Sequence, residues 1–197
     1  MTDLRTVEAI LRSDFYSFVQ AIFPLVSPND SLKRNWHLEA MTYALTRVLK
    51  GEFRRLVITV PPRSLKSICA SVAFPAFALG HNPQLRFICA SYAETLAFAH
   101  SRSCRDVIRS SQYQRLFPQT KIFLGRDNQM EFSTTRGGFR MSTSVGGTLT
   151  GRGGNFVIID DPMSLLTNAT CPAGSKLEIT VASLKCWNGQ LDSSDHM

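Results

Sequence analysis

The sequence lacks the long apolar runs and the leader pattern of membrane and exported proteins. Nowhere do its 197 residues approach the roughly 18 unbroken apolar residues of a spanning helix, and the mean hydropathy is −0.04. The first residues, Met1-Thr-Asp-Leu-Arg5, show no basic region followed by an apolar stretch. From the residues alone we expect no transmembrane helix, no membrane partner and no secretion.

Cysteine is also sparse, and its spacing does not suit a disulfide framework or a zinc site. The five cysteines are an odd number and form no Cys-x-x-Cys pair, which argues against a disulfide framework and against a zinc site. No internal repeat and no low-complexity tract is visible. Apolar residues make up 44% of the chain and aromatic residues 10%, enough to bury the core of one ordinary domain. We expect a domain that folds in a reducing cytoplasm.

Acidic residues are fewer than basic ones, and most of the basic ones are arginine. Twenty-two Lys and Arg residues stand against 15 Asp and Glu residues, giving a net charge of +7, and 16 of the 22 are arginine. Arginine suits bidentate contacts with phosphate. The composition predicts a phosphate-rich partner or substrate, with a merely soluble basic surface as the alternative. Arginine is absent from residues 164–197, whose apolar periodicity is weak.

The apolar periodicity predicts alternating helices and strands. Helical spacing covers four stretches: 3–23, 35–50, 66–79 with a kink at Pro75, and 92–117 with a break near Ser110. Short β-rich runs indicate buried strands at 55–60, 85–90 and 155–159, and a hairpin at 129–134 and 138–144. This alternation predicts an α/β fold whose sheet is mainly parallel and flanked by helices. We expect a helical lead-in over 1–51, a core over 52–163 and an atypical tail over 164–197.

The first candidate for chemistry is the segment Pro61-Pro-Arg-Ser-Leu-Lys-Ser67, between a predicted strand and a predicted helix. A phosphate-binding loop needs inward backbone N–H groups, a lysine for the β- and γ-phosphates and a Ser or Thr for Mg²⁺. Lys66 and Ser67 stand at the Lys-Ser positions, whereas Val60 and Leu65 replace the two glycines of the motif. Because proline has no N–H, the donors would all lie after the second proline. A chance Lys-Ser pair is the alternative.

The second candidate is a pair of carboxylates after a buried strand. The run Phe156-Val-Ile-Ile159 is followed by Asp160 and Asp161, and ligands of open α/β sheets bind at the C-terminal ends of the strands. One carboxylate can hold Mg²⁺ while the next orients or deprotonates a water. An Asp-Asp-Pro turn that merely closes the strand is the alternative. Together the two candidates make the Lys-Ser and acid pair of a nucleotide hydrolase.

Several segments in order resemble the N-terminal ATPase domain of tailed-phage and prophage terminase large subunits. Residues 55–67 resemble that family's deviant Walker A motif, in which Pro-Pro-Arg precedes Lys-Ser. Further similar segments follow in the family's order: Phe77-Ala-Leu-Gly-His-Asn-Pro83, Ala90-Ser-Tyr92, Arg105-Asp-Val-Ile108, Leu116-Phe-Pro118, Gly146-Gly-Thr-Leu-Thr-Gly-Arg-Gly153 and Ile158-Ile-Asp-Asp-Pro162. The resemblance covers residues 30–163.

The resemblance implies a P-loop NTPase core of the additional-strand type, with ATP as substrate and Mg²⁺ as cofactor. Lys66 would contact the β- and γ-phosphates, and Arg63 would lie against the γ-phosphate. Asp160 and Ser67 would hold Mg²⁺. Asp161 would act on the attacking water, although it is one methylene shorter than the Glu of many related motors. The implied nucleotide-binding residues are Arg63, Ser64, Leu65, Lys66, Ser67 and His37, the last by stacking on a base or, alternatively, as an ordinary helix histidine.

The family's partners are double-stranded DNA, a portal or procapsid, a terminase small subunit and further copies of the large subunit in a ring. The resemblance therefore implies ATP-driven DNA packaging in the cytoplasm of a bacterial host. Arg152, in a glycine-rich loop, is a candidate contact to nucleotide or DNA, with loop solubility as the alternative. We expect His81 and His100 at the surface.

The chain departs from the family after Pro162. Family members continue into a coupling motif and an RNase H-like nuclease with an acidic metal cluster, and neither is visible here. We therefore expect a truncated form without nuclease, whose tail over 164–197 is foreign to the fold. Two alternatives stay open: a helicase-like DNA translocase, and an inactive remnant that binds nucleotide or DNA.

Overall fold

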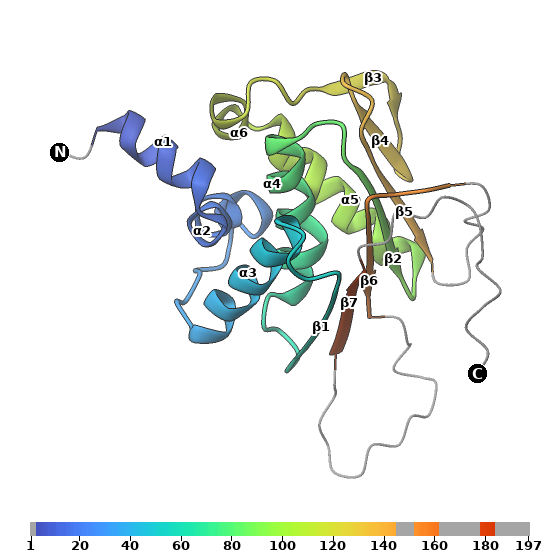
Figure 1. Cartoon of the computed structure of the whole chain (residues 1–197), viewed down its shortest axis with the longest axis horizontal. Helices are drawn as coiled ribbons and strands as arrows, with labels where there is room; N and C mark the ends of the chain where they lie inside the picture. Colours follow the sequence, from blue (N-terminus) through green and yellow to red (C-terminus); the bar gives the residue numbers. More distant parts are fainter. Residues whose placement is uncertain (1–2, 145–151, 162–177, 184–197) are drawn as a thin grey trace, which may run out of the picture.

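The computed structural model describes residues 3–144, 152–161 and 178–183 of the chain (Figure 1). The helices are α1 (Leu4–Ser13), α2 (Phe15–Val26), α3 (Trp36–Leu49), the π-helical segment η1 (Ile68–Ala73), α4 (Phe74–His81), α5 (Glu94–Arg109) and α6 (Ser111–Leu116). The strands are β1 (Arg55–Val60), β2 (Arg86–Ser91), β3 (Ile122–Asp127), β4 (Glu131–Thr134), β5 (Phe139–Ser144), β6 (Phe156–Asp160) and β7 (Glu178–Ser183). No helix in this part of the chain is long and apolar enough to cross a membrane.

The strands form one open sheet in the order β1-β7-β6-β2-β5-β4-β3. β2 pairs in parallel with β5 and with β6, whereas the other four neighbouring pairs are antiparallel. The predicted α/β class with flanking helices is confirmed, but the sheet is mixed rather than mainly parallel. Two features cause this: the β3-β4-β5 meander extends one side, and β7 enters the other side in the reverse direction.

The strand β7 comes from the tail that the sequence sets apart from the core. It lies between β1 and β6, with Val181 opposite both Val57 and Ile159. Residues 178–183 are therefore an inner strand of the sheet, in contrast to the prediction that the whole of 164–197 is foreign to the fold. The other tail residues, 164–177 and 184–197, lie outside the part of the chain described.

The single helix predicted for residues 3–23 is two helices in the structure. The break falls at Asp14, whose carboxylate accepts a hydrogen bond of 2.7 Å from the backbone N–H of Ser17 and so caps α2. An aspartate that caps a new helix competes with continuation of the preceding one. Pro24, the first residue beyond the predicted helical stretch 3–23, lies inside the last turn of α2. The prediction was wrong at both places.

The remaining helices and strands agree with the predicted ones to within a few residues, apart from β3, which the periodicity did not indicate. Gly51 follows α3 with φ 77°, the left-handed conformation that suits glycine after a helix. Ser110 separates α5 from α6 and caps α6, because its hydroxyl accepts a hydrogen bond of 3.1 Å from the Tyr113 N–H. The predicted hairpin is present as β4 and β5.

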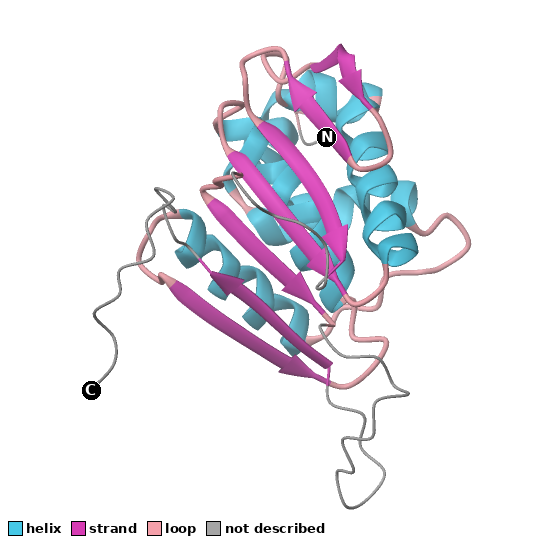
Figure 2. Ribbon diagram, turned by 90° about the vertical axis from the view of Figure 1, so that its right-hand side faces the viewer, coloured by secondary structure: helices cyan, strands magenta, loops and turns pink. Residues whose placement is uncertain are grey.

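The helices of the described chain pack on one face of the sheet, and Figure 2 shows the strands standing in front of them. The core between the layers is rich in aromatic rings. Burying one such side chain contributes about 1.5–3 kcal/mol. The rings with contacts across α2, α4, β2 and β6 are Phe15, Phe18, Phe74, Phe77, Phe87 and Phe156. These contacts fix α4, and with it the preceding η1, against the sheet.

The C-terminal ends of β1, β2, β5 and β6 meet at one edge of the sheet. Asp160 lies opposite Ser91 in β2, and Ser91 lies opposite Ser144 in β5. β1 runs in the same direction as β6, because each is antiparallel to the intervening β7. The loop after β1 and the two aspartates at the end of β6 are therefore brought to the same edge.

Candidate functional site

The loop between β1 and η1 has a backbone suited to an anion although it contains no glycine. Arg63 has φ 64° and Leu65 has φ 62°, both in the left-handed region, on either side of Ser64. This conformation costs a non-glycine residue about 1–2 kcal/mol. Left-handed residues are a component of anion-binding backbone nests, in which successive N–H groups turn toward one concave side.

This loop places Lys66 against two carboxylates at the end of β6, those of Asp160 and Asp161. Its side chain is wholly buried, its ammonium forms an ion pair with Asp161, and the distance from Nζ to the Asp160 Oδ1 atom is 3.5 Å. Buried charges require partners of opposite sign. Lys66 and Asp161 are 95 positions apart in the chain. The structure thus brings together three predicted site residues, Lys66, Asp160 and Asp161.

The two aspartates differ in their access to solvent. The side chain of Asp160 is 1% exposed, whereas that of Asp161 is 25% exposed. Asp161 has φ 47°, and its carbonyl accepts a hydrogen bond of 3.2 Å from the Tyr92 N–H. Asp is one of the residues that tolerates the left-handed region. The Asp160 carboxylate is therefore shielded from solvent, whereas a water molecule can reach the Asp161 carboxylate.

Two further side chains contact Asp160 that the sequence did not indicate. The Ser71 hydroxyl donates a hydrogen bond of 3.0 Å to Oδ2 of Asp160. The His100 Nδ1 atom lies 3.6 Å from the same oxygen, and the His100 side chain is 14% exposed. The prediction that His100 lies at the surface was therefore wrong, whereas His81 is exposed as expected.

A sequence signal for His100 did exist. The buried face of α5 runs through Ala97, Ser101 and Cys104, and His100 is three residues after the first of these and four before the last. Helical spacing alone therefore turns it toward the sheet. Ser71 had no comparable signal, because its position depends on the π-helical turn that follows the loop.

Burial lowers the pKa of His100, and the nearby Asp160 carboxylate opposes this shift only in part. The imidazole is therefore neutral at pH 7, since its ordinary pKa is about 6.5. A neutral ring does not balance the charge of Asp160. Among the described residues, Lys66 is a cation that faces both carboxylates.

The other predicted nucleotide-binding residues lie around the loop or on α3. Arg63 is exposed, and Ser64, Leu65 and Ser67 are half-buried. Ser67 directly precedes η1. His37 lies in the first turn of α3, where its ring is edge-on to Trp36 at 6.4 Å between ring centres. α3 packs against β1 and η1, on either side of the loop.

Arg152 is not brought to this cluster. It precedes β6 and so lies at the opposite end of that strand from Asp160. Its Nη1 atom is 2.9 Å from Oε2 of Glu131, and its guanidinium lies over the Phe139 ring at 5.9 Å from the ring centre. The structure places Arg152 in a salt bridge on the β4-β5 side of the sheet.

The donor set of the site fits Mg²⁺ bound together with a phosphate rather than a metal held by protein alone. Within the described residues no group of three or more His, Cys, Asp and Glu side chains could hold a metal ion. Mg²⁺ needs only one or two carboxylates when waters and phosphate oxygens complete its shell. Asp160, Asp161 and the Ser67 hydroxyl are donors of this kind. The buried ammonium of Lys66 shows that the two carboxylates already face a positive charge.

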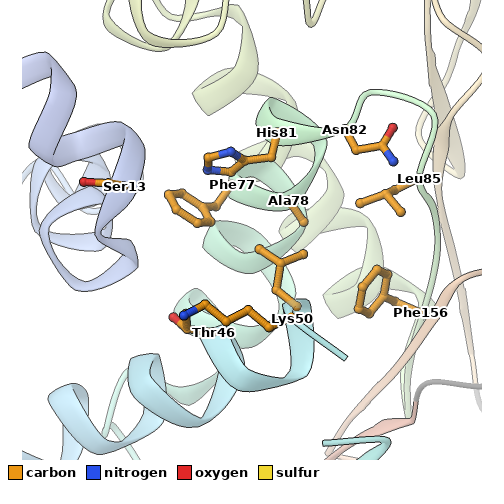
Figure 3. Close-up of a pocket in the computed structure, with 10 residues that line it drawn as sticks. Ser13, Thr46, Lys50, Phe77, Ala78, His81, Asn82, Leu85 and Phe156 are labelled. Atoms are coloured by element: carbon orange, nitrogen blue, oxygen red, sulfur yellow. The ribbon is translucent and has the colours of Figure 1, made fainter. Parts of the chain in front are cut away.

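A separate, mostly apolar pocket of about 370 Å³ lies near the other end of the sheet, and Figure 3 shows its lining. Phe77 and His81 line it from α4, and Thr46 and Lys50 line it from the end of α3. None of the predicted nucleotide-binding or metal-binding residues lines this pocket. It is therefore distinct from the cluster at Lys66.

Comparison with protein-family models, with curated proteins and with solved structures finds no match to this chain. The arrangement of its own residues is what bears on its function.

Proposed function

We propose that this chain is an ATPase core similar to that of terminase large subunits, which hydrolyses ATP with Mg²⁺ to move double-stranded DNA. One observation carries the proposal: a lysine from a glycine-free loop with left-handed residues meets the two carboxylates at the end of β6. A phosphate-binding loop beside an acid pair is the arrangement that positions a nucleoside triphosphate and its attacking water.

In the proposed reaction the loop holds the triphosphate. The backbone N–H groups of Arg63 to Ser67 would face the phosphate oxygens, and Lys66 would add a positive charge at the β- and γ-phosphates. The exposed Arg63 guanidinium is free to swing over the γ-phosphate, where charge develops as the bond to the leaving group breaks. In this proposal the strained backbone serves to direct the N–H groups of the loop toward the phosphates.

The two carboxylates have different roles in the proposed reaction. Asp160, buried and held by Ser71, would anchor Mg²⁺ together with the Ser67 hydroxyl, and the ion would neutralise charge on the β- and γ-phosphates. Asp161, the more exposed of the two, would accept a hydrogen bond from the attacking water and take its proton. Its shorter side chain places this base closer to β6 than a glutamate would.

Lys66 must change partners in this scheme. In the structure its ammonium contacts Asp161, so Asp161 is engaged as long as the lysine stays there. A triphosphate in the loop offers Lys66 a stronger anion and draws the ammonium away from Asp161. The carboxylate is then released to act on water only after the substrate has bound.

Double-stranded DNA is the proposed polymer, with a portal or procapsid, a small terminase subunit and a ring of identical subunits as further proposed partners. The charge of +7 and the predominance of arginine support a polyanion. The rival in which the chain binds nucleotide without hydrolysing it predicts binding but no turnover. Steady-state ATPase rates with and without DNA and procapsid separate the two.

The test of the site is nucleotide binding by three variants, measured by calorimetry with ATP and Mg²⁺. Lys66→Ala should weaken binding by more than about 1 kcal/mol, because it removes a charge-assisted hydrogen bond. Asp160→Asn should abolish the Mg²⁺ dependence. Asp161→Asn should leave binding largely intact and lower turnover.

The matched control is Lys121→Ala, a lysine exposed before β3, which should bind like the wild type. Circular dichroism checks that each variant is folded, because loss of Lys66 leaves two carboxylates close together. Equal affinity of wild type and Lys66→Ala would remove the phosphate-loop assignment. Exchanged phenotypes of the two aspartate variants would show that their roles are reversed.

A further inference from the structure

A fully buried arginine lies on β5, outside the residues used above. Nη1 of Arg140 donates a hydrogen bond of 2.6 Å to the Ser142 hydroxyl, and Nη2 donates one of 3.0 Å to the backbone carbonyl of Ser71. Both acceptors are neutral, and within the described residues no ion pair joins Arg140 to a carboxylate. Burying a guanidinium without a counter-charge is expensive. An apolar residue would pack here at lower cost, so the arginine points to a role other than stability.

The Ser71 carbonyl has no α-helical donor. In an α-helix it would accept a hydrogen bond from the N–H of the residue four positions later, and that residue is Pro75, which has no N–H. The segment is instead π-helical over Ile68–Ala73, where the N–H of Phe74 bonds to the carbonyl of Cys69, five positions earlier. Arg140 donates to the Ser71 carbonyl from outside the helix.

Ser71 makes two contacts, one through its backbone carbonyl and one through its side-chain hydroxyl. Its carbonyl is fixed by Arg140, and its hydroxyl donates to Asp160 at 3.0 Å. Arg140 and Asp160 stand on β5 and β6, with β2 between them. A single residue of η1 therefore connects a buried cation on one strand to the acid at the end of another.

We propose that Arg140 is a positioning residue of the nucleotide site, which holds the Ser71 backbone so that the Ser71 hydroxyl orients the Asp160 carboxylate. The inference rests on the proposed function, in which Asp160 anchors Mg²⁺. Arg140 touches neither nucleotide nor metal. Outer partners of this kind change metal affinity by about 10–100-fold when they are removed.

The test measures the Mg²⁺ concentration that gives half-maximal binding of a fluorescent ATP analogue. Arg140→Met should raise this concentration about 10-fold or more, and Ser71→Ala should raise it to a similar extent. The double variant should be no worse than either single variant, because both changes cut the same connection. Arg105→Met is the matched control: Arg105 pairs with Asp127 and lies over Phe132, so its loss should leave the Mg²⁺ requirement unchanged.

Pro75→Ala provides a rescue that a merely structural arginine would not show. Alanine restores an N–H at position 75, four residues after Ser71, and so allows the segment to take the α-helical register in which this N–H donates to the Ser71 carbonyl. In the Arg140→Met background, Pro75→Ala should therefore recover much of the Mg²⁺ affinity. It should also raise the urea midpoint of unfolding, measured without metal or nucleotide. If Arg140→Met does not fold, Arg140→Lys and Ser71→Ala carry the same comparison.

The outcomes separate this inference from the function on which it rests. If the wild type shows no Mg²⁺-dependent nucleotide binding, the proposed function fails and the inference fails with it. If the wild type binds and folded Arg140→Met has the wild-type Mg²⁺ requirement, only the inference is overturned. Additive effects of Arg140→Met and Ser71→Ala, or no rescue by Pro75→Ala, would overturn it as well.

Discussion

Leu65 and Arg63 show at the residue scale how a loop can take the conformation of a glycine-rich one. Leu65 packs against the core, and its carbonyl accepts a hydrogen bond of 2.9 Å from the Cys69 N–H. The next residue, Lys66, is anchored on the carboxylates. Contacts on both sides of the strained position therefore hold it in the left-handed region, where glycine would need no such support.

Arg63→Gly should make the protein more stable and less active. Arg63 is exposed with φ 64°, so glycine removes the steric cost without loss of packing. The gain of about 1–2 kcal/mol is reduced by the greater freedom of glycine in the unfolded chain, about 0.4–1 kcal/mol. We expect a net rise of roughly 0.5–1 kcal/mol in the free energy of unfolding, measured with urea, and a lower rate of ATP turnover. Arg63→Ala keeps the strain and serves as the control; if its stability equals that of Arg63→Gly, the loop is not strained at this residue.

His100 should make the fold sensitive to acid. Burial lowers its pKa, with Arg140 and Lys66 acting in the same direction and Asp160 and Asp161 opposing. In the unfolded chain the pKa returns to about 6.5, so between the folded value and 6.5 the unfolded state binds more protons. Stability therefore rises with pH across that window and is lost as pH falls below about 6.5.

His100→Gln should remove this part of the pH dependence. One proton contributes a slope of at most about 1.4 kcal/mol per pH unit, so urea unfolding at pH 7.5 and pH 5.5 can resolve it. We expect wild type to lose more stability than the variant between these pH values. The same loss in both proteins would mean that protonation of His100 is not coupled to folding.

At the scale of elements, β7 decides how the site is assembled. It is hydrogen-bonded to β1 on one side and to β6 on the other. The loop with Lys66 extends from β1, and the two aspartates lie at the end of β6. The spacing between lysine and carboxylates therefore depends on a strand from the far end of the chain.

Val181→Pro should unfold or strongly destabilise the protein. In an inner strand every backbone N–H is used by a neighbour, and proline removes one donor and leaves its acceptor unpaired. We expect a loss of about 2 kcal/mol or more in the free energy of unfolding, together with loss of nucleotide binding. The control is Leu124→Pro, at an 83% exposed residue of the edge strand β3 where the pairing with β4 is irregular. Equal tolerance of both prolines would show that β7 is not an inner strand in solution.

At the scale of the whole molecule, several arginines lie in ion pairs and others face solvent. Arg105 and Arg109 pair with Asp127, and other arginines pair with Glu131. Arg86 and Arg136, in contrast, line a polar hollow of about 450 Å³. This hollow lies where β2 begins, at the opposite edge of the sheet from Lys66. It is the surface that we expect to meet the phosphates of DNA.

Binding to double-stranded DNA should be independent of sequence and should weaken steeply with salt, because phosphate contacts release counterions. The combined Arg86→Ala and Arg136→Ala variant should lower the slope of log affinity against log salt by up to about two, since each contact contributes about 0.9. Fluorescence anisotropy with two unrelated duplexes at several salt concentrations provides the measurement. A flat salt dependence in the wild type would mean that the positive charge serves solubility alone.

The sequence by itself determined where most of the strands and helices lie and which chemical groups stand at their ends. Lys66 after one strand and Asp160-Asp161 after another follow from local apolar patterns and from the rule that parallel strands present their C-terminal ends together. Local patterns also predicted the helix break at Ser110, the β4-β5 hairpin and the α/β class. Such features depend on a few neighbouring residues, so one sequence suffices to read them.

Only the tertiary structure decided the partners of those groups. The insertion of β7, the burial of His100, the pairing of Arg152 with Glu131 and the connection from Arg140 through Ser71 to Asp160 join residues far apart in the chain. Their energies arise from burial and from hydrogen bonds between distant elements, which no local pattern encodes. The left-handed residues of the glycine-free loop belong here too, because the contacts that hold them exist only in the folded chain.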